Sequence, residues 1–307
     1  MILYVTGNLF QSPAQVLVNT VNTVGVMGKG VAYEFKRLLP EMFAQYRDLC
    51  EKGQITVGKL WLYQTPNKWV LNFPTKTHWR EPSRLEYITA GLDAFVRHYA
   101  RLGIHSIAFP PLGCGNGQLD FGTQVQPVME RYLRNLPIEV FIYPGLKGSL
   151  IPEHQNVEEM RAWLRSEPTS LPFSEVWDDL AGILADQNSF RTLDDRCQFT
   201  LELDHQAHEL HIIADGRERP RVSYDALLAF WQQLRTHGFS MQQIAPALGE
   251  EAPFILPLFA RLPYVATVRL ADHYDRFSLN PIVGLQVLPR AFMQHSAPAQ
   301  MALFEMG

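Results

Sequence analysis

The sequence is poor in cysteine, has no lysine in its second half and contains no long apolar run. Its three cysteines, Cys50, Cys114 and Cys197, are too few and too far apart for a disulfide framework or a CxxC metal motif. No stretch approaches the roughly 18–20 apolar residues that a membrane span requires, and residues 1–7 lack the basic region of a signal peptide. We therefore expect a soluble protein of the reducing cytoplasm, without a membrane partner.

The net charge of −4 conceals an asymmetry between the two halves of the chain. Residues 1–150 carry 15 Lys and Arg against 10 Asp and Glu (net +5), and residues 151–307 carry 12 against 21 (net −9). All seven lysines lie in the first half. A basic domain suits phosphate-rich ligands and an acidic domain suits a basic protein surface, so we expect two domains with different partners.

The first half alternates short β-rich runs with segments of helical periodicity. The β-rich runs predict strands at residues 2–5, 16–19, 60–63, 69–72, 106–110 and 140–143. Apolar residues at three- and four-residue spacing predict helices at residues 29–39, 41–51, 85–102 and 122–136. This alternation is typical of an α/β fold with a mostly parallel sheet between two helix layers, where ligands bind beyond the carboxyl ends of the strands.

A second domain follows a break at residues 144–148. We predict a first domain at residues 1–148, a linker with a polar helix (156–166) at residues 149–172, and an α+β domain at residues 173–307. The pattern of this second domain indicates helices at 175–185, 224–236, 240–248 and 253–262, a hairpin of residues 197–203 and 210–214, and a strand pair at 265–270 and 282–288. Short helices followed by a strand pair resemble a winged-helix arrangement.

Two glycine-rich loops follow different predicted strands. The first runs from Asn19 and Asn22 through Gly28 and Gly30 into a helix, whose N–H groups attract anions such as a diphosphate. It matches neither the GxGxxG nor the Walker motif, and an ordinary strand-to-helix turn explains it equally well. The second loop, residues 110–120, has three glycines within five positions and can hold a phosphate with main-chain amides. Together the loops can hold a diphosphate from both sides.

These segments resemble a macrodomain, the ADP-ribose-binding three-layer α/β/α fold, over residues 1–145. The resemblance rests on Val-Thr-Gly-Asn-Leu (5–9), Val-Asn-Thr-Val-Asn (18–22), the loop at 28–32 and Pro-Leu-Gly-Cys-Gly (111–115). The pair Thr75-Lys76 at a strand end is similar to the DarG family of DNA ADP-ribosyl glycohydrolases. The resemblance implies an ADP-ribose site formed by Gly7, Asn8, Leu9, Asn19, Asn22, Gly28, Gly30, Val31, Ala32, Thr75, His78, Leu112, Gly113, Cys114, Gly115, Asn116 and Gly117.

The family resemblance also implies a function. In this family a lysine at the Lys76 position is catalytic, and the C-terminal domain holds the toxin, a DarT-like ADP-ribosyltransferase that modifies thymidine in single-stranded DNA. A lysine whose charge is disfavoured by burial or by another cation is a competent nucleophile, here for the anomeric carbon of the distal ribose. The alternative is a solvated Lys76 that binds DNA phosphate. No cofactor or metal is expected, because backbone amides hold the diphosphate and the lysine supplies the chemistry.

The sequence departs from related lysine-dependent macrodomains at two positions. Those proteins carry an aspartate in the second loop that helps to resolve the lysine adduct, whereas Asp120 comes later and is expected to start the next helix. Either another group, such as His78, activates water, or no lasting adduct forms. Asn8 replaces the common adenine-binding aspartate and can still donate to and accept from the adenine edge. Asn22 either orients the distal ribose or bonds its own turn, and Cys114 is expected to be a small loop residue.

The remaining candidates each have a structural alternative. The cluster Trp79, Arg80 and Arg84 can stack on a base and hold phosphate, or it can pack around a helix. Three histidines in the acidic half have a spacing that matches no zinc motif, so surface residues are the favoured interpretation: His205, His208 and His211.

The acidic half has the wrong charge for DNA, since DNA binding requires several Lys or Arg on phosphates. Its carboxylates, such as Glu175, Asp178 and Asp179, are either phosphate substitutes that a basic toxin binds or an ordinary solvated surface. Two other functions remain open. One is a glycohydrolase or deacylase acting on modified protein or O-acetyl-ADP-ribose. The other is a non-enzymatic ADP-ribose reader fused to a winged-helix DNA-binding module.

Overall fold

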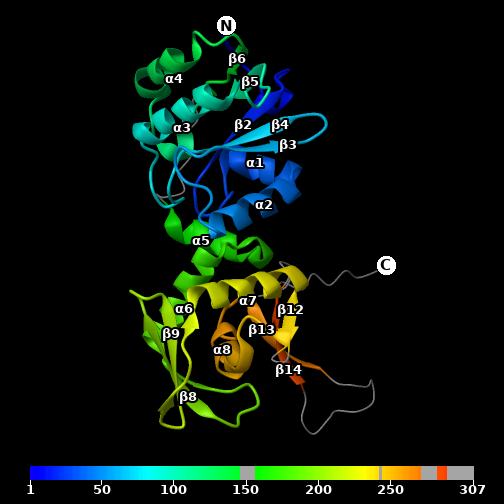
Figure 1. Cartoon of the computed structure of the whole chain (residues 1–307), viewed down its shortest axis with the longest axis vertical. Helices are drawn as coiled ribbons and strands as arrows, with labels where there is room; N and C mark the ends of the chain where they lie inside the picture. Colours follow the sequence, from blue (N-terminus) through cyan, green and yellow to red (C-terminus); the bar gives the residue numbers. More distant parts are fainter. Residues whose placement is uncertain (146–155, 242–243, 271–281, 289–307) are drawn as a thin grey trace, which may run out of the picture. The chain divides into compact units, whose positions relative to one another are not determined.

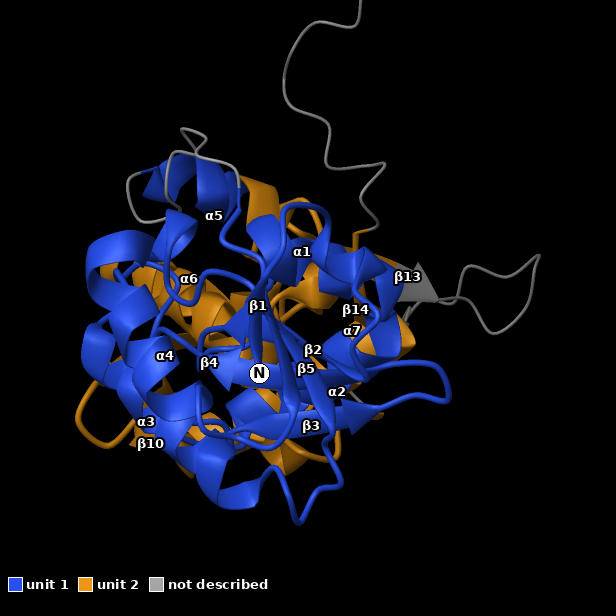
Figure 2. Cartoon of the chain, turned by 90° about the horizontal axis from the view of Figure 1, so that it is seen from above, with its two compact units in different colours: residues 1–162 blue, residues 163–307 orange. Residues whose placement is uncertain are grey.

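The chain forms two compact units, residues 1–162 and residues 163–307, in a computed structural model that describes residues 1–145, 156–241, 244–270 and 282–288 (Figure 2). The boundary falls inside α5 (Val157–Arg165), the polar helix that the sequence predicted. Residues 149–155 of the predicted linker lie outside the described residues. The later linker residues belong to the second unit, where the Leu171 carbonyl accepts from Trp231 Nε1 (3.3 Å) and Arg235 Nη1 (3.0 Å).

Unit 1 contains a six-stranded sheet in the order β1-β6-β5-β2-β4-β3 (Figure 1). Its strands are β1 (Ile2–Tyr4), β2 (Val16–Val21), β3 (Trp61–Gln64), β4 (Trp69–Pro74), β5 (Ser106–Phe109) and β6 (Glu139–Ile142). Neighbouring strands pair in parallel except β3, which pairs antiparallel with β4. The six predicted strands and the mostly parallel sheet are therefore confirmed. Asn19 lies inside β2, because that strand extends two residues beyond its predicted end.

Helices cover both faces of this sheet. α1 (Gly30–Leu38) and α2 (Pro40–Glu51) lie on one face, and α3 (Leu85–His98) and α4 (Gln126–Leu133) on the other (Figure 2). Each face has its own apolar core, with Phe35 and Tyr46 buried on the first and Phe95 and Met129 on the second. This is the three-layer α/β/α arrangement that the resemblance implied. Three short turns complete the unit: η1 (Leu9–Gln11), η2 (Gly115–Gly117) and the π-helical η3 (Phe121–Val125).

The packing of α3 on β4 depends on a glycine. A Cβ atom on Gly91 would lie 2.1 Å from the ring of Phe73, so only a residue without a side chain allows this close approach. Phe73 is completely buried and lies in β4 near the strand end that leads to Lys76. The same contact therefore fixes the position from which the candidate catalytic loop begins.

In its described residues, unit 2 contains two antiparallel sheets and three further helices (Figure 1). Its elements are η5 (Pro168–Ser170), α6 (Phe173–Asp186), β7 (Ser189–Arg191), β8 (Gln198–Asp204), β9 (Glu209–Ala214), β10 (Arg217–Glu218), β11 (Val222–Ser223), α7 (Tyr224–His237), β12 (Phe239–Met241), η7 (Gly249–Glu251), α8 (Ala252–Phe259), β13 (Val265–Leu270) and β14 (Ile282–Val287). One sheet has the order β10-β9-β8-β7, with β11 also pairing with β9, and the other has the order β12-β14-β13. The predicted β8–β9 hairpin and β13–β14 pair are both present.

The predicted helix at residues 240–248 is wrong, because its first residues form a strand and residues 246–248 form a turn. Ser240 and Met241 belong to β12, where they pair with Leu285 and Gly284 of β14, and residues 242–243 lie outside the described residues. The tertiary contact explains the difference, because Gly284 has no side chain and lets the Ser240 backbone approach closely. The winged-helix interpretation of these helices and strands stays a prediction.

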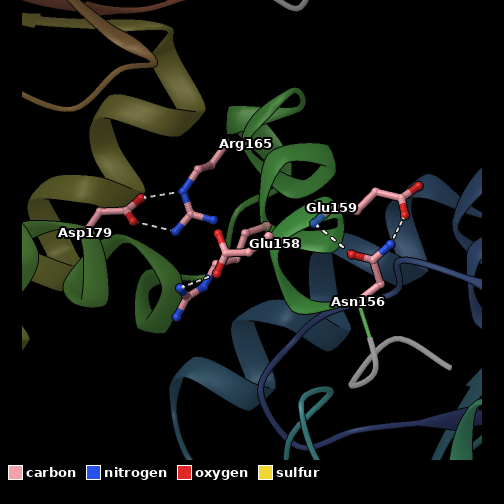
Figure 3. Close-up of polar contacts among 6 residues, drawn as sticks. Asn156, Glu158, Glu159, Arg165 and Asp179 are labelled. Carbon is pink, nitrogen blue, oxygen red and sulfur yellow. Dashed lines mark hydrogen bonds and ion pairs between the residues drawn. The ribbon is translucent and has the colours of Figure 1, made fainter.

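The carboxylates of α6 do not all face solvent, which corrects the expected acidic surface. Glu175 is completely buried, and Asp179 forms a two-pronged ion pair with Arg165, whose Nε donates to Oδ2 at 3.0 Å (Figure 3). Tyr264 also donates to that Oδ2 atom at 2.8 Å. Glu175 and Asp179 are four residues apart and so share one helix face, which here points inward. Of the three predicted residues, only Asp178 is exposed.

No helix within the described ranges is both long and apolar enough to cross a membrane. The three cysteines are all free thiols.

Candidate active site

A cavity of about 830 Å³ lies at the carboxyl ends of four strands in unit 1. Its walls come from Thr75, Lys76 and Ser83 after β4, from parts of residues 20–32 at the end of β2 and beyond it, from parts of residues 110–123 after β5, and from residues 144–145 after β6. Ligands of open α/β sheets bind at this edge, because the strands end there together and their loops converge. Both glycine-rich loops therefore line the same cavity, as the sequence predicted.

Most of the predicted site residues line this cavity. They are Asn22, Gly28, Gly30, Val31, Ala32, Thr75, Lys76, Gly113, Cys114, Gly115, Asn116 and Gly117. Six others do not line it: Gly7, Asn8, Leu9, Asn19, His78 and Leu112.

Five of these six residues have local structural contacts. Leu9 and Leu112 are buried in the core, and the buried Asn19 donates from Nδ2 to Asn72 Oδ1 at 2.9 Å. Asn8 caps η1, because its side chain accepts from Phe10 N at 3.0 Å. His78 accepts from Arg80 N at 3.1 Å through Nδ1. The suggestion that His78 activates water stays a prediction.

Lys76 lies in the cavity wall directly after β4 and is only 6% exposed. Backbone contacts fix its loop on both sides. Thr75 N donates to Val21 O at 2.8 Å, and the Thr77 carbonyl accepts from Thr23 N (3.3 Å) and Thr23 Oγ1 (2.6 Å). The end of β4 is thus tied to the end of β2, so the Lys76 backbone is held at a defined point of the wall.

The side chain of Asn22 holds the turn that opens the first glycine-rich loop. Its Oδ1 accepts from Val24 N (3.0 Å) and Val26 N (3.2 Å), and its Nδ2 donates to Val26 O (2.7 Å). The turn-forming interpretation is therefore correct. One Nδ2 hydrogen is used in the bond to Val26 O, and only the other could be donated to a ligand. Beneath this turn, the hydroxyl of the fully buried Tyr46 donates to Asn22 O at 2.6 Å. Burial raises the pKa of Tyr46 well above its ordinary value, so the phenol keeps its proton.

The second glycine-rich loop packs closely on Ser83. Ser83 N donates to Gly117 O at 3.0 Å, and a Cβ atom on Gly117 would lie 2.2 Å from Ser83 Oγ. The loop also approaches the first one, since a Cβ atom on Gly30 would lie 3.3 Å from Asn116 Nδ2. Within the described residues, neither Ser83 Oγ nor Asn116 Oδ1 has a hydrogen-bond partner, although both are buried. Two polar atoms of the cavity wall are therefore left unsatisfied.

Cys114 and Asp120 behave as the sequence suggested. Burial, and secondarily the charge of Asp120, raise the pKa of Cys114 to about 12, so it stays a protonated thiol. Asp120 caps η3, because its Oδ1 accepts from Thr123 N (2.7 Å) and Thr123 Oγ1 (2.6 Å). Asp120 also lines the cavity, which the prediction that it starts a helix did not include.

Sequence reasoning missed several residues of the cavity wall. Phe121, Thr123, Pro144 and Gly145 all line it. Pro144 and Gly145 follow a predicted strand, so the rule that ligands bind at carboxyl ends could have found them. Ser83 offered no such signal, because it lies nine residues beyond the end of β4 and reaches the cavity only through the folding of its loop.

The predicted DNA-contact cluster is only partly at the surface. Trp79 is completely buried, so the prediction that it stacks on a base is wrong and the packing alternative is correct. Arg80 lies over the Trp79 ring at 4.8 Å from its centroid, and Arg84 lies 5.7 Å from the Tyr87 ring. Arg80 covers a face of the indole ring. This contact depends on how the loop folds, so the burial of Trp79 could not be predicted from the sequence.

The three histidines of the acidic half belong to the β8–β9 hairpin. His205 and His208 are exposed, and His211 Nδ1 lies 3.8 Å from Glu218. In the part of the chain that the structure describes, no three His, Cys, Asp or Glu side chains are grouped so that they could hold a metal ion.

Comparison with known proteins agrees with this geometry. The Macro domain family model matches residues 18–127. The DNA ADP-ribosyl glycohydrolase of Mycobacterium tuberculosis is 41% identical over 198 residues, which are 60% of this chain and 55% of that protein. A DNA ADP-ribosyl transferase–DNA ADP-ribosyl glycohydrolase fusion protein of Thermosipho africanus is 39% identical over 170 residues, 49% of this chain and 43% of that protein. The chain spans about half the length of the curated relatives it matches.

A solved structure matches the N-terminal half in sequence. The macrodomain of Thermus aquaticus DarG is 45% identical to this chain, with a TM-score of 0.45, and the match covers 47% of this chain and 99% of that one.

Proposed function

We propose that this chain, whose first unit matches the macrodomain family model and the curated DNA ADP-ribosyl glycohydrolases, acts as a DarG-type enzyme and removes ADP-ribose from thymidine in single-stranded DNA by hydrolysis. We further propose that Lys76 carries the chemistry and that unit 2 binds the cognate DarT-like ADP-ribosyltransferase toxin. The observation that carries the catalytic proposal is the buried Lys76 in the wall of a cavity that both glycine-rich loops share.

The cavity suits ADP-ribose in size and lining. Its volume of about 830 Å³ falls in the usual range for small-molecule sites, about 300–1,000 Å³. The glycines of the two loops leave main-chain atoms uncovered where a diphosphate would lie. The unsatisfied Ser83 Oγ and Asn116 Oδ1 add polar groups from the same wall. In this arrangement the diphosphate lies between the loops and the distal ribose extends toward Lys76.

The proposed reaction begins with the uncharged amine of Lys76. Burial removes water that stabilises an ammonium group, so it favours the nucleophilic form of a lysine. The amine attacks C1 of the distal ribose, and the bond between C1 and the thymine nitrogen breaks. The thymine nitrogen takes up the proton that the amine releases. Water then hydrolyses the lysine–C1 bond, which yields free ADP-ribose and restores Lys76.

A comparison of substrates tests the proposed specificity. The chain is incubated with an oligonucleotide ADP-ribosylated on thymidine and, separately, with ADP-ribosylated protein and O-acetyl-ADP-ribose. We expect release of ADP-ribose from the oligonucleotide at least a hundredfold faster than from either alternative. Faster release from protein or from the acetyl ester would contradict the DNA assignment.

Two features support the proposed toxin-binding role of unit 2. Residues 151–307 have a net charge of −9 and contain no lysine, which suits a basic protein and not DNA. The Thermosipho relative is named as a fusion of a transferase with a glycohydrolase, so the two activities occur together in one protein there.

A DarT-like ADP-ribosyltransferase is the appropriate binding partner for a test. We expect the full chain to bind it tightly and to inhibit its activity. Salt-dependent binding of the full chain to unmodified duplex DNA, with no binding to the transferase, would instead favour an ADP-ribose reader with a DNA-binding module.

A further inference from the structure

Unit 2 carries an aromatic surface pocket to which the proposed function has so far assigned no role. Its volume is about 530 Å³, and its lining includes the rings of Trp177, His208 and Tyr224. The centroids of the Trp177 and Tyr224 rings are 5.0 Å apart, and the Trp177 and His208 rings are stacked at 6.1 Å. The completely buried Phe173 packs against Tyr224, with the two ring centroids 4.8 Å apart.

Three elements build this pocket and hold its rings in place. Trp177 comes from α6, Tyr224 begins α7, and His208 lies in the turn between β8 and β9. Tyr224 N donates to His208 O at 2.9 Å, which fastens the hairpin turn to the start of α7. Ser223 caps the same helix by accepting from Ala226 N at 3.3 Å. The aromatic rings are thus displayed on a fixed backbone and do not depend on one flexible segment.

The charges around the pocket are negative. The exposed carboxylates of Asp178 and Asp225 belong to its lining, and among the residues that the structure describes no lysine or arginine lines it. Aromatic faces attract cations, most strongly those of tryptophan, and nearby carboxylates reinforce that attraction. The pocket therefore fits a guanidinium or ammonium group on an apolar stem. A phosphate or a nucleic acid would be repelled by both carboxylates.

We propose that this pocket receives an arginine or lysine side chain of a basic protein partner. The inference rests on the proposed toxin-binding role of unit 2 and gives it a location. Charge complementarity selects the occupant, because unit 2 lies in the lysine-free, acidic part of the chain and the pocket combines its exposed carboxylates with stacked rings. Aromatic pockets that take up an arginine are typical positions for the residues that dominate a protein interface.

Binding of the full chain to a DarT-like ADP-ribosyltransferase tests the proposal. Two variants alter the pocket in different ways: Trp177→Leu removes the indole, and Asp178→Asn with Asp225→Asn removes both charges. A matched control changes two exposed acidic residues of the same unit, Glu202→Gln with Asp215→Asn. Dissociation constants are measured at low and high salt, and thermal unfolding confirms that each variant is folded.

We expect each pocket variant to weaken binding by at least tenfold, and the control pair to stay within twofold of the unaltered chain. The double charge variant should also show a smaller salt dependence, because two screened attractions are lost. Because Asp178 and Asp225 are exposed, their replacement tests the pocket even if Trp177→Leu impairs folding. Unchanged binding by the double charge variant, or an equal loss in the control pair, would overturn the proposal. Failure of the unaltered chain to bind the transferase would instead reject the toxin-binding role itself.

Discussion

Replacement of Tyr46 by phenylalanine should weaken ADP-ribose binding although Tyr46 does not line the cavity. The substitution keeps the ring in the core and removes only the hydroxyl, which donates to Asn22 O at 2.6 Å. A buried carbonyl that loses its donor costs about 1–3 kcal/mol. Because Asn22 opens the first glycine-rich loop, we expect part of this cost to appear as disorder of the loop in the absence of ligand.

The expected magnitude follows from these energies. A loss of about 1.4 kcal/mol in binding corresponds to a tenfold rise in the dissociation constant. A similar loss in stability lowers the melting temperature by about 3–6 °C for a unit of this size. Titration calorimetry with ADP-ribose measures the first quantity, and scanning calorimetry measures the second.

A matched control separates the site from general stability. Tyr264 is also fully buried, and its hydroxyl donates to Asp179 in unit 2 at 2.8 Å. Tyr264→Phe should therefore reduce stability and leave the dissociation constant for ADP-ribose unchanged. Wild-type affinity in Tyr46→Phe, or an equal loss of affinity in both variants, would refute the role assigned to Tyr46.

Three further predictions concern glycine and cysteine residues. Gly117→Ala should weaken ADP-ribose binding at least tenfold in calorimetry, because its Cβ atom would lie 2.2 Å from Ser83 Oγ, whereas Gly182→Ala in unit 2, with no atom within 4 Å of its Cβ, should bind normally. Cys114→Ala should retain full turnover in a release assay, because the thiol, with a pKa of about 12, is protonated and is not a nucleophile. Burial raises the pKa of Cys50 in the folded protein to about 12. As the pH rises above about 9, the Cys50 thiol therefore loses its proton in the unfolded state while it stays protonated in the folded state. The free energy of unfolding should consequently fall by about 1.4 kcal/mol per pH unit between about pH 9 and 12 through this group. Denaturant titrations of Cys50→Ala should lack this part of the decline, and an identical pH profile would contradict the assignment.

The fold of the N-terminal half could be predicted because its local patterns and its tertiary contacts agree. Each strand of the parallel sheet is a short β-rich run, and each helix has one apolar face that the sheet buries. The second half was less predictable. Ser240 and Met241 join a strand because Gly284 lets β14 approach them, and that partner lies more than 40 residues away in the sequence. Such pairing is decided by tertiary contact and not by local propensity.

The cavity could be predicted in outline but not residue by residue. Loops that follow parallel strands must meet at one edge of the sheet, and this geometry brought Gly30, Lys76 and Gly115 together. The burial of Trp79 and the arrival of Ser83 at the cavity depend on how the segment after β4 folds back, which no periodic pattern encodes.

The acidic residues of α6 show the same limit. Asp178 and Asp179 are adjacent in the sequence, yet one is exposed and the other is paired with Arg165. Adjacent positions on a helix point about 100° apart, so composition gives the charge of a helix but not the direction in which each charge points.

The rate of the chemical step in Lys76→Ala tests the central claim most directly. The measurement uses a thymidine-ADP-ribosylated oligonucleotide under single-turnover conditions with saturating protein, so that binding does not limit the rate. Lys29→Ala is the matched control, because Lys29 also lines the cavity. We predict that Lys76→Ala lowers the rate at least a thousandfold while ADP-ribose affinity changes by less than about fivefold, roughly 1 kcal/mol, and that Lys29→Ala keeps a near-normal rate. Release of ADP-ribose by Lys76→Ala at the unaltered rate would contradict the account.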